Sequence, residues 1–115
     1  RVPRRRMTRP VLLTDGAARD LDEWYAAAHA RGGLAEATRI LDRLQVVLTR
    51  LGAGELRDEP LPELRALGIA AARQHVTEDG QRVVFRAQAD RVVVVLLAPV
   101  NRSYRSLLER RLLDA

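Results

Sequence analysis

The sequence predicts an α+β fold in which helices pack on one face of an antiparallel sheet. Two patterns in the apolar residues carry this prediction. In the first half of the chain these residues recur at helical spacing, whereas from residue 68 onward they form short runs, some alternating with polar residues, as strands do. The predicted order is one strand, two helices, three strands and a short C-terminal helix, and tight turns between the strands favour a meander.

The N-terminal half is predicted to begin with a short strand and to continue as two helices. Residues 10–14 (PVLLT) form the strand, and Thr14 or Asp15 can cap the helix that follows. The first helix extends to Arg31, where two glycines stop it, and the second covers about residues 34–51. Because the joint between them is short, the two helices are expected to form an antiparallel hairpin.

Residues 52–63 are predicted to be a surface connection, because they combine two glycines, two prolines and a run of charge. Three strands are expected after this connection, and two tight turns, Asp79-Gly80 and Ala89-Asp90, separate them. The strands cover residues 68–76, 81–88 and 92–98. The last strand is continuously apolar, which indicates burial on both of its faces.

The chain after the last strand is predicted to turn into a short helix. Pro99 is expected to end the pairing of the strand, because proline has no N–H to donate to the ladder. Asn101 or Ser103 can then cap the helix. Its apolar face comprises Tyr104, Leu107, Leu108 and Leu112.

At 115 residues the chain suits a single compact domain. The arginine-rich residues 1–6 are expected to be a tag remnant or an upstream extension, with Met7 as the natural start, so that the domain comprises residues 7–115. The absence of Cys excludes disulfides, thiolate zinc sites and cysteine nucleophiles. His29 has no second ligand at metal spacing, and no metal or cofactor is expected. No apolar run reaches the roughly 18 residues of a membrane span, so a cytoplasmic protein is expected.

The net charge of +5 is unevenly distributed and comes from arginine alone. Residues 15–63 carry ten acids against six arginines, whereas residues 64–115 carry nine arginines against five acids. Guanidinium groups are permanently charged and suit carboxylates or phosphates. An anionic partner is therefore expected at the C-terminal half, although a lysine-free chain equally fits a bias in codon composition.

Three stretches resemble the RelE/ParE superfamily of bacterial toxins from type II toxin-antitoxin modules. They are the lead-in ELRALGI, the hairpin RVVFRAQADRVVVVLL and the ending NRSYRSLLERRLL, and the resemblance covers nearly everything after Met7. The ending is particularly similar to ParE-like plasmid stabilisation proteins. The resemblance implies a small toxin that is held inactive by an antitoxin encoded beside it, whose C-terminal segment wraps the toxin surface.

The superfamily contains two activities, and the resemblance leaves both open. ParE-like members inhibit DNA gyrase by binding it, whereas RelE-like members cleave messenger RNA on the ribosome. The ParE-like activity is favoured, because the lysines on which many RelE-like members depend are absent and arginine does not serve readily as a base. A non-toxic interaction domain on the same fold is a third reading. Whether the chain is an enzyme is therefore left open, as is the choice between a homodimer and a toxin-antitoxin hetero-oligomer.

The resemblance also implies candidate residues for a ribonuclease site. Arg82 matches an arginine that contacts the scissile phosphate in RelE-like members, while a local ion pair with Asp79 or Glu78 is the structural alternative. Arg73 and His75 alternate on the preceding strand and could face the same side as Arg82. His75 is the side chain here that titrates near neutral pH, although a structural histidine is the more common case.

Two further candidates follow the last strand. Arg102 falls where the family carries an arginine, and Tyr104 lies near a C-terminal tyrosine used by several ribonuclease members. Tyr104 departs from the pattern because it comes only two residues after Arg102, and its helical spacing with the leucines favours a core-facing ring. For a binding toxin, we expect a basic face on which an acidic or amphipathic antitoxin segment docks. This face comprises Arg73, Arg82, Arg86 and Arg102.

Overall fold

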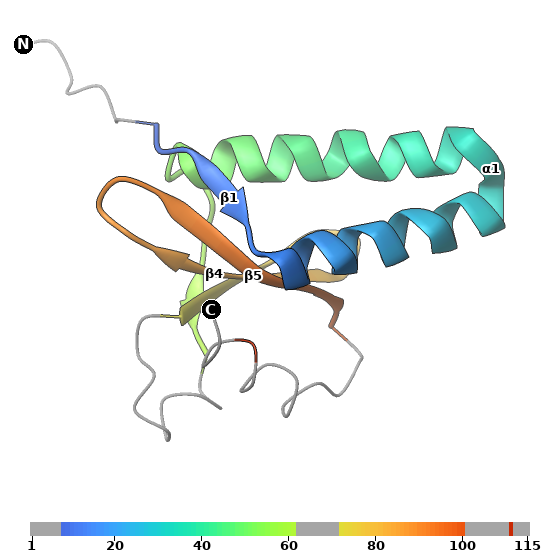
Figure 1. Ribbon diagram of the computed structural model, residues 1–115. Coiled ribbons are helices and arrows are strands. Elements are labelled where there is room, and N and C mark those ends of the chain that lie inside the picture. Colours follow the sequence, from blue (N-terminus) through green and yellow to red (C-terminus); the bar gives the residue numbers. More distant parts are fainter. Residues whose placement is uncertain (1–7, 62–71, 101–110, 112–115) are drawn as a thin grey trace, which may run out of the picture.

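The computed structural model describes residues 8–61, 72–100 and 111, and it confirms the α+β class (Figure 1). One long helix lies along one side of a five-stranded sheet. The elements are β1 (Val11–Leu13), α1 (Asp15–Gly52), β2 (Glu59–Pro60), β3 (Ala72–Val76), β4 (Gln81–Ala87) and β5 (Val92–Pro99). In the described ranges no helix is both long and apolar enough to cross a membrane.

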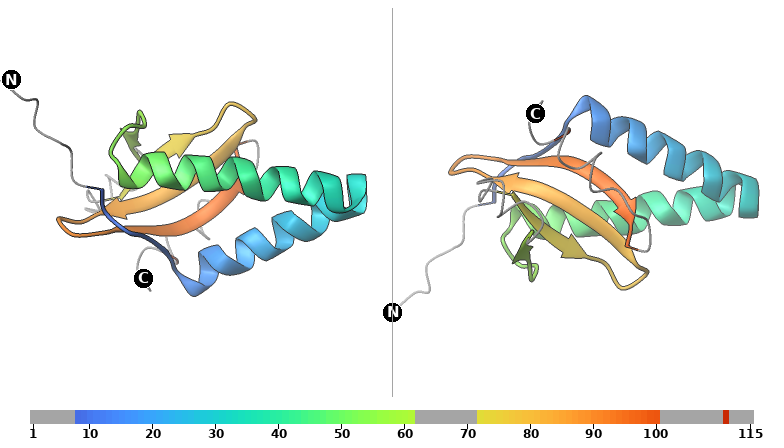
Figure 2. Two further views of the ribbon diagram at one scale, coloured as in Figure 1. Left: turned by 90° about the horizontal axis from the view of Figure 1, so that it is seen from above. Right: turned by 90° about the horizontal axis from the view of Figure 1, so that it is seen from below.

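The helical half of the chain is one element, α1, with an internal bend. Thr14 caps it as predicted, because its side-chain oxygen accepts a hydrogen bond from the N–H of Ala17 at 3.2 Å. Gly33 is the residue inside α1 with non-helical backbone angles, at φ 72° and ψ −162°, a conformation that glycine adopts without steric cost. Beyond the bend, the second arm runs back alongside the first (Figures 1 and 2). The two helices predicted on either side of Gly33 are thus the two arms of α1, joined by a kink instead of a connecting loop.

The sheet is mixed, with the strand order β1-β5-β4-β3-β2. The pairs β2–β3, β3–β4 and β4–β5 are antiparallel, as the predicted meander requires. β1 instead lies parallel to β5, with Val11 opposite Val92 and Leu13 opposite Val94. The prediction of a purely antiparallel sheet was wrong for this strand, because apolar periodicity does not determine the direction in which two strands pair. The two-residue strand β2 also lies inside the segment predicted to be a surface connection.

A register shift in the β4–β5 pair decides which side chains of β5 face α1. Val84 lies opposite Leu96, but its neighbour Phe85 lies opposite Val94, so Val95 is an extra residue on β5. Such an extra residue shifts the alternation of side chains between the two faces by one position, so that the alternation before the bulge and the alternation after it are out of step. Val94 and Leu97 consequently face α1, although they are three residues apart.

Buried residues occupy both faces of the sheet, which we call the inner face, toward α1, and the outer face, away from it. On the inner face the buried cluster comprises Ala17, Leu44, Leu51, Val83, Phe85, Val92, Val94 and Leu97. A second cluster contains the buried outer-face residues and comprises Leu61, Ala72, Val84, Val95, Leu96 and Ala98. The prediction that the apolar strand is covered on both faces is therefore confirmed for β5.

The end of β5 differs slightly from the prediction. Pro99 still lies opposite Gln81, and the N–H of Val100 donates to the carbonyl of Gly80 at 3.0 Å. Pairing thus extends one residue past the proline, because Pro99 lacks only its own N–H. The predicted C-terminal helix with its caps, and the first residues of the predicted strand 68–76, lie outside the described residues.

Candidate functional site

A row of polar side chains crosses three strands on the outer face. Arg82 on β4 donates from Nη1 to Oε1 of Gln74 on β3. Gln74 in turn donates from Nε2 to Oε1 of Glu59 on β2 at 2.8 Å. We call Glu59, Gln74 and Arg82 the polar row. Gln74 is only 5% exposed, so both ends of its amide need partners, and the row supplies an acceptor and a donor.

The polar row fixes the direction of the Arg82 guanidinium on the outer face. Arg86 lies four residues further along β4 and therefore projects from the same face, opposite Ala72 on β3 and Val93 on β5. Two guanidinium groups thus project from one strand on the same side of the sheet. Such groups suit the planar oxygens of a carboxylate or a phosphate.

Arg73 and His75 lie on the inner face, opposite to Arg82 and Arg86. Residues that are directly paired across antiparallel strands point to the same side of a sheet. Arg73 is paired with Phe85 and His75 with Val83, both of which pack under α1. The expected common side for Arg73, His75 and Arg82 is therefore wrong, because the pairing register places them on different faces.

Both inner-face candidates are engaged locally. The Nε of Arg73 donates to the Asp58 carboxylate. Nδ1 of His75 lies 2.7 Å from the carbonyl oxygen of Arg57, and because a carbonyl only accepts, this nitrogen carries the proton. His75 is thus positioned as a structural contact to the segment before β2.

The structural alternative for Arg82 also differs from the expectation. Nη1 of Arg82 donates to Gln74 rather than to a carboxylate of the hairpin turn. Asp79 instead accepts the hydroxyl of Thr77 and lies 3.7 Å from Arg43 on the second arm of α1. The remaining candidates, Arg102 and Tyr104, lie outside the described residues, and their roles stay predictions.

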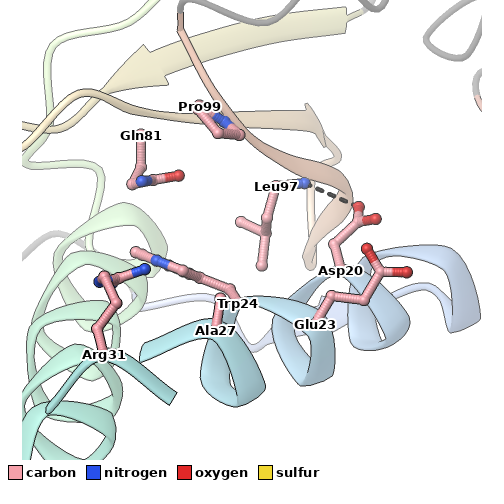
Figure 3. Close-up of a pocket in the computed structure, with 8 residues that line it drawn as sticks. All are labelled: Asp20, Glu23, Trp24, Ala27, Arg31, Gln81, Leu97 and Pro99. Atoms are coloured by element: carbon pink, nitrogen blue, oxygen red, sulfur yellow. Dashed lines mark hydrogen bonds between the residues drawn. The ribbon is translucent and has the colours of Figure 1, made fainter. Parts of the chain in front are cut away.

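An ion pair between Asp20 and Arg111 closes part of the β5 edge, and the sequence analysis did not identify it. Nη1 and Nη2 of Arg111 lie 2.9 and 3.0 Å from the two carboxylate oxygens of Asp20. Nη1 also donates to the carbonyl of Val95 at 3.1 Å. The N–H of Leu97 donates to Asp20 at 3.1 Å (Figure 3). The hydrogen bond to Asp20 raises the pKa of Arg111, against the opposing effect of burial. Two backbone groups of β5 beyond the end of β1 are thereby satisfied.

The close packing of Arg111 explains why position 16 of α1 is a glycine. A Cβ on Gly16 would lie 2.8 Å from Nε and 2.9 Å from Cζ of Arg111, so a side chain there would displace the guanidinium. One signal for this pair was present in the sequence. Asp20 lies next to the apolar stripe of the first arm, between Ala17 and Trp24, where an acid needs a partner.

A cavity of about 350 Å³ lies between the first arm of α1 and the adjoining ends of β4 and β5 (Figure 3). Trp24 lines it, together with Leu97 and Pro99 of β5 and Gln81 of β4. The ring of Trp24 also packs against the inner-face cluster, as its position on the apolar stripe predicted. The sequence did not indicate that the ring, which carries a polar indole N–H, would also line a cavity.

Comparison with solved structures identifies the architecture. The chain matches a chain of the chromosomal ParDE toxin-antitoxin system from P. aeruginosa with a TM-score of 0.66 and 18% identity, over 82% of this chain and 98% of that chain. The chain has the RelE/ParE fold. It also matches the toxin-antitoxin complex RelBE2 from Mycobacterium tuberculosis with a TM-score of 0.59 and 22% identity, over 81% of this chain and 99% of that chain.

No protein-family model and no curated protein sequence matches the chain. The likeness is one of fold, and it confirms the predicted RelE/ParE architecture. Within this RelE/ParE fold, the described part of the chain offers three polar features, which are the polar row beside Arg86, the Asp20–Arg111 pair and the cavity beside Trp24.

Proposed function

We propose that residues 7–115 form a single toxin domain of a type II toxin-antitoxin module, neutralised by a cognate antitoxin. The observation that carries this proposal is the RelE/ParE fold, which the chain shares over four fifths of its length with chains of two toxin-antitoxin systems. The proposed targets act in the cytoplasm, so the toxin is placed there.

Within this proposal, a ParE-like toxin that inhibits DNA gyrase by binding is favoured. RNA cleavage requires a base for the 2′-hydroxyl as well as a cation for the phosphate. His75, the histidine candidate for this base, lies on the inner face and is bound to the carbonyl of Arg57. In the described part of the outer face, Arg82 is flanked by Gln74 and by the apolar Val76 and Ala98, and the carboxylate of the polar row, Glu59, is engaged by Gln74. This arrangement supports binding over cleavage.

A RelE-like ribonuclease is the second candidate, and one observation favours it. The polar row holds the Arg82 guanidinium in a fixed direction, which is what stabilisation of a phosphate in a transition state needs. In this alternative Arg82 and Arg86 would neutralise the phosphate, and Arg102 and Tyr104 would complete the site.

For either activity we propose that Arg82, Arg86 and Arg102 contact an anionic partner, and that Arg73 does not share their surface. The partner would be an acidic segment of the antitoxin in the neutralised state and the target in the active state. Charge-assisted contacts from guanidinium groups suit both.

The test begins with expression of the chain without an antitoxin, which should arrest growth. Purified protein is then assayed in parallel for gyrase-mediated DNA cleavage and for messenger RNA cleavage on programmed ribosomes. Activity with gyrase alone supports the ParE-like proposal, and activity on ribosomes alone supports the RelE-like alternative. A folded chain without growth arrest would overturn both and leave an interaction domain. Light scattering of the chain with and without its antitoxin distinguishes a homodimer from a hetero-oligomer.

A further inference from the structure

The strand β5 is longer than the strand that covers its edge. β1 pairs with it only from Val92 to Val94, whereas β5 continues to Pro99. In the part of the chain that the structure describes, the stretch of β5 after Val94 pairs with β4 on one side and with no strand on the other. An edge without a strand offers its N–H and C=O groups to a strand of another chain.

The sequence of β5 makes this edge prone to association. The run from Val92 to Ala98 is entirely apolar, contains no glycine or proline and consists mostly of valine, which is typical of segments that pair between chains. Such a strand associates with a copy of itself when its edge is accessible. Any protection of the edge must therefore come from the end of the strand or from other elements.

Two charged side chains and one proline occupy the described edge. The N–H of Leu97 donates to the Asp20 carboxylate (Figure 3), and the carbonyl of Val95 accepts from Arg111. Pro99 lies two residues after Leu97 and therefore faces the same edge, but it has no N–H. A strand placed alongside β5 would thus find no free N–H at Leu97 or Pro99 and an occupied carbonyl at Val95.

The first arm of α1 does not close this edge with its own backbone. It is the side chain of Asp20 that bonds β5, and a cavity of about 350 Å³ separates Ala27 of the arm from Leu97 and Pro99. The arm therefore stands away from the end of β5. Closure of the edge depends on the side chains between the arm and the strand.

We call Asp20 and Arg111 the edge plug, and its two members are held firmly. The guanidinium lies 2.9 and 3.0 Å from the two carboxylate oxygens, and both side chains are mostly buried. Gly16 leaves the space for the guanidinium, because a Cβ there would lie 2.8 Å from its Nε. A strand that displaced the plug would separate two mostly buried charges, which is strongly unfavourable.

We propose that the edge plug prevents β5 from pairing with β5 of a second copy of the chain. A second copy fits this edge because two β5 strands related by a two-fold axis run antiparallel and present the same apolar sequence to each other. The plug thereby keeps the sheet of one molecule from continuing into the sheet of another. This inference goes beyond the proposed function and does not depend on it, since the edge is separate from the outer-face arginines.

The test opens the edge and measures association. Asp20→Ala combined with Arg111→Ala removes both charges together, so that neither is left without its partner. Sedimentation velocity over a range of concentrations should give a dimer dissociation constant at least about tenfold lower than that of the unmodified chain. Val84→Ala truncates a buried residue of the outer face and leaves the plug in place. This control for lost stability should associate like the unmodified chain.

Hydrogen exchange at the Leu97 amide identifies the surface that associates. In the double variant this N–H loses Asp20, so it should exchange rapidly in dilute solution and become protected as the dimer forms. Unchanged association of the double variant would overturn the proposal. Association that leaves the Leu97 amide unprotected would also overturn it, because another surface would then be responsible.

A milder variant serves if the double variant does not fold. Arg111→Met keeps most of the stem of the side chain and frees only the carbonyl of Val95. It should associate more tightly than the unmodified chain, but less tightly than a chain with a fully open edge. Association equal to that of the unmodified chain would show that the plug contributes to stability alone.

Discussion

The inner and outer faces of the sheet are both buried, but different kinds of residue pack on them. On the inner face, Phe85 and Val83 pack against α1, and the charged groups of β3 reach partners at the rim, as in the Arg73–Asp58 pair. On the outer face the buried apolar residues are aliphatic, and the polar row crosses between them with a buried amide at its centre. The inner face is therefore organised for stability, whereas the outer face carries fixed polar groups that can also recognise a partner.

The difference can be tested by truncating one buried residue on each face. Phe85→Ala should lower the free energy of unfolding by about 4 kcal/mol, because it leaves a large cavity beneath α1. Val84→Ala, its neighbour on the outer face, should cost about 2 kcal/mol, since only two methyl groups are removed. Urea unfolding of both variants measures the two values. Equal losses would show that the two faces do not differ in this way.

The assignment of side chains to these faces shows what the sequence could and could not predict. Alternation within β3 and β4 and the turn at Asp79-Gly80 followed from local pattern, because strand period and turn chemistry are local properties. The separation of Arg73 from Arg82 did not, because it depends on pairing Val76 with Arg82 across the hairpin. A shift of one residue would have reversed it.

Contacts between residues far apart in the sequence were the second feature that could not be predicted. Asp20 and Arg111 lie 91 positions apart, and no periodicity connects them. The bulge at Val95, which decides that Leu97 faces α1, likewise leaves no signal in a run of identical valines. The candidate site was consequently predicted as a set of residue types, and its division between two faces and an edge came from the structure.

The Asp20–Arg111 pair at the edge between the faces should give the next largest effect. Both side chains are mostly buried, at 12% and 20% exposed, so Asp20→Asn should lower the free energy of unfolding by about 2 to 3 kcal/mol. Because folding raises the pKa of Arg111, its contribution to the free energy of unfolding is fully present at any pH below its pKa in the unfolded chain. That contribution is lost only as the pH rises through its pKa in the folded protein, far above neutrality. The loss measured by urea unfolding should therefore be the same at pH 6 and at pH 9.

A smaller effect is expected from the polar row. Gln74→Leu fits the buried site in size but removes the acceptor for Arg82 and the donor for Glu59, so we expect a loss of about 1 to 2 kcal/mol. Thr77→Val, directly after the same strand, removes a hydroxyl that bonds Asp79 and the N–H of Gln81 but not Arg82, so it is the control for binding. If the row orients Arg82 for a partner, Gln74→Leu should also weaken antitoxin binding by more than its stability loss explains. Unchanged binding by calorimetry would make the row purely structural.

The smallest effect on stability is expected from Arg73, and this variant separates the faces most directly. Arg73 and Asp58 are 38% and 28% exposed, so Arg73→Gln should cost less than about 1 kcal/mol. Arg82→Gln is its matched partner, with the same change of charge on the adjacent strand and the opposite face. Growth arrest should persist with Arg73→Gln and be weakened with Arg82→Gln, once both variants are shown to be folded. The reverse order would place the binding surface on the inner face, because net charge is identical in the two variants and only the side of the sheet differs.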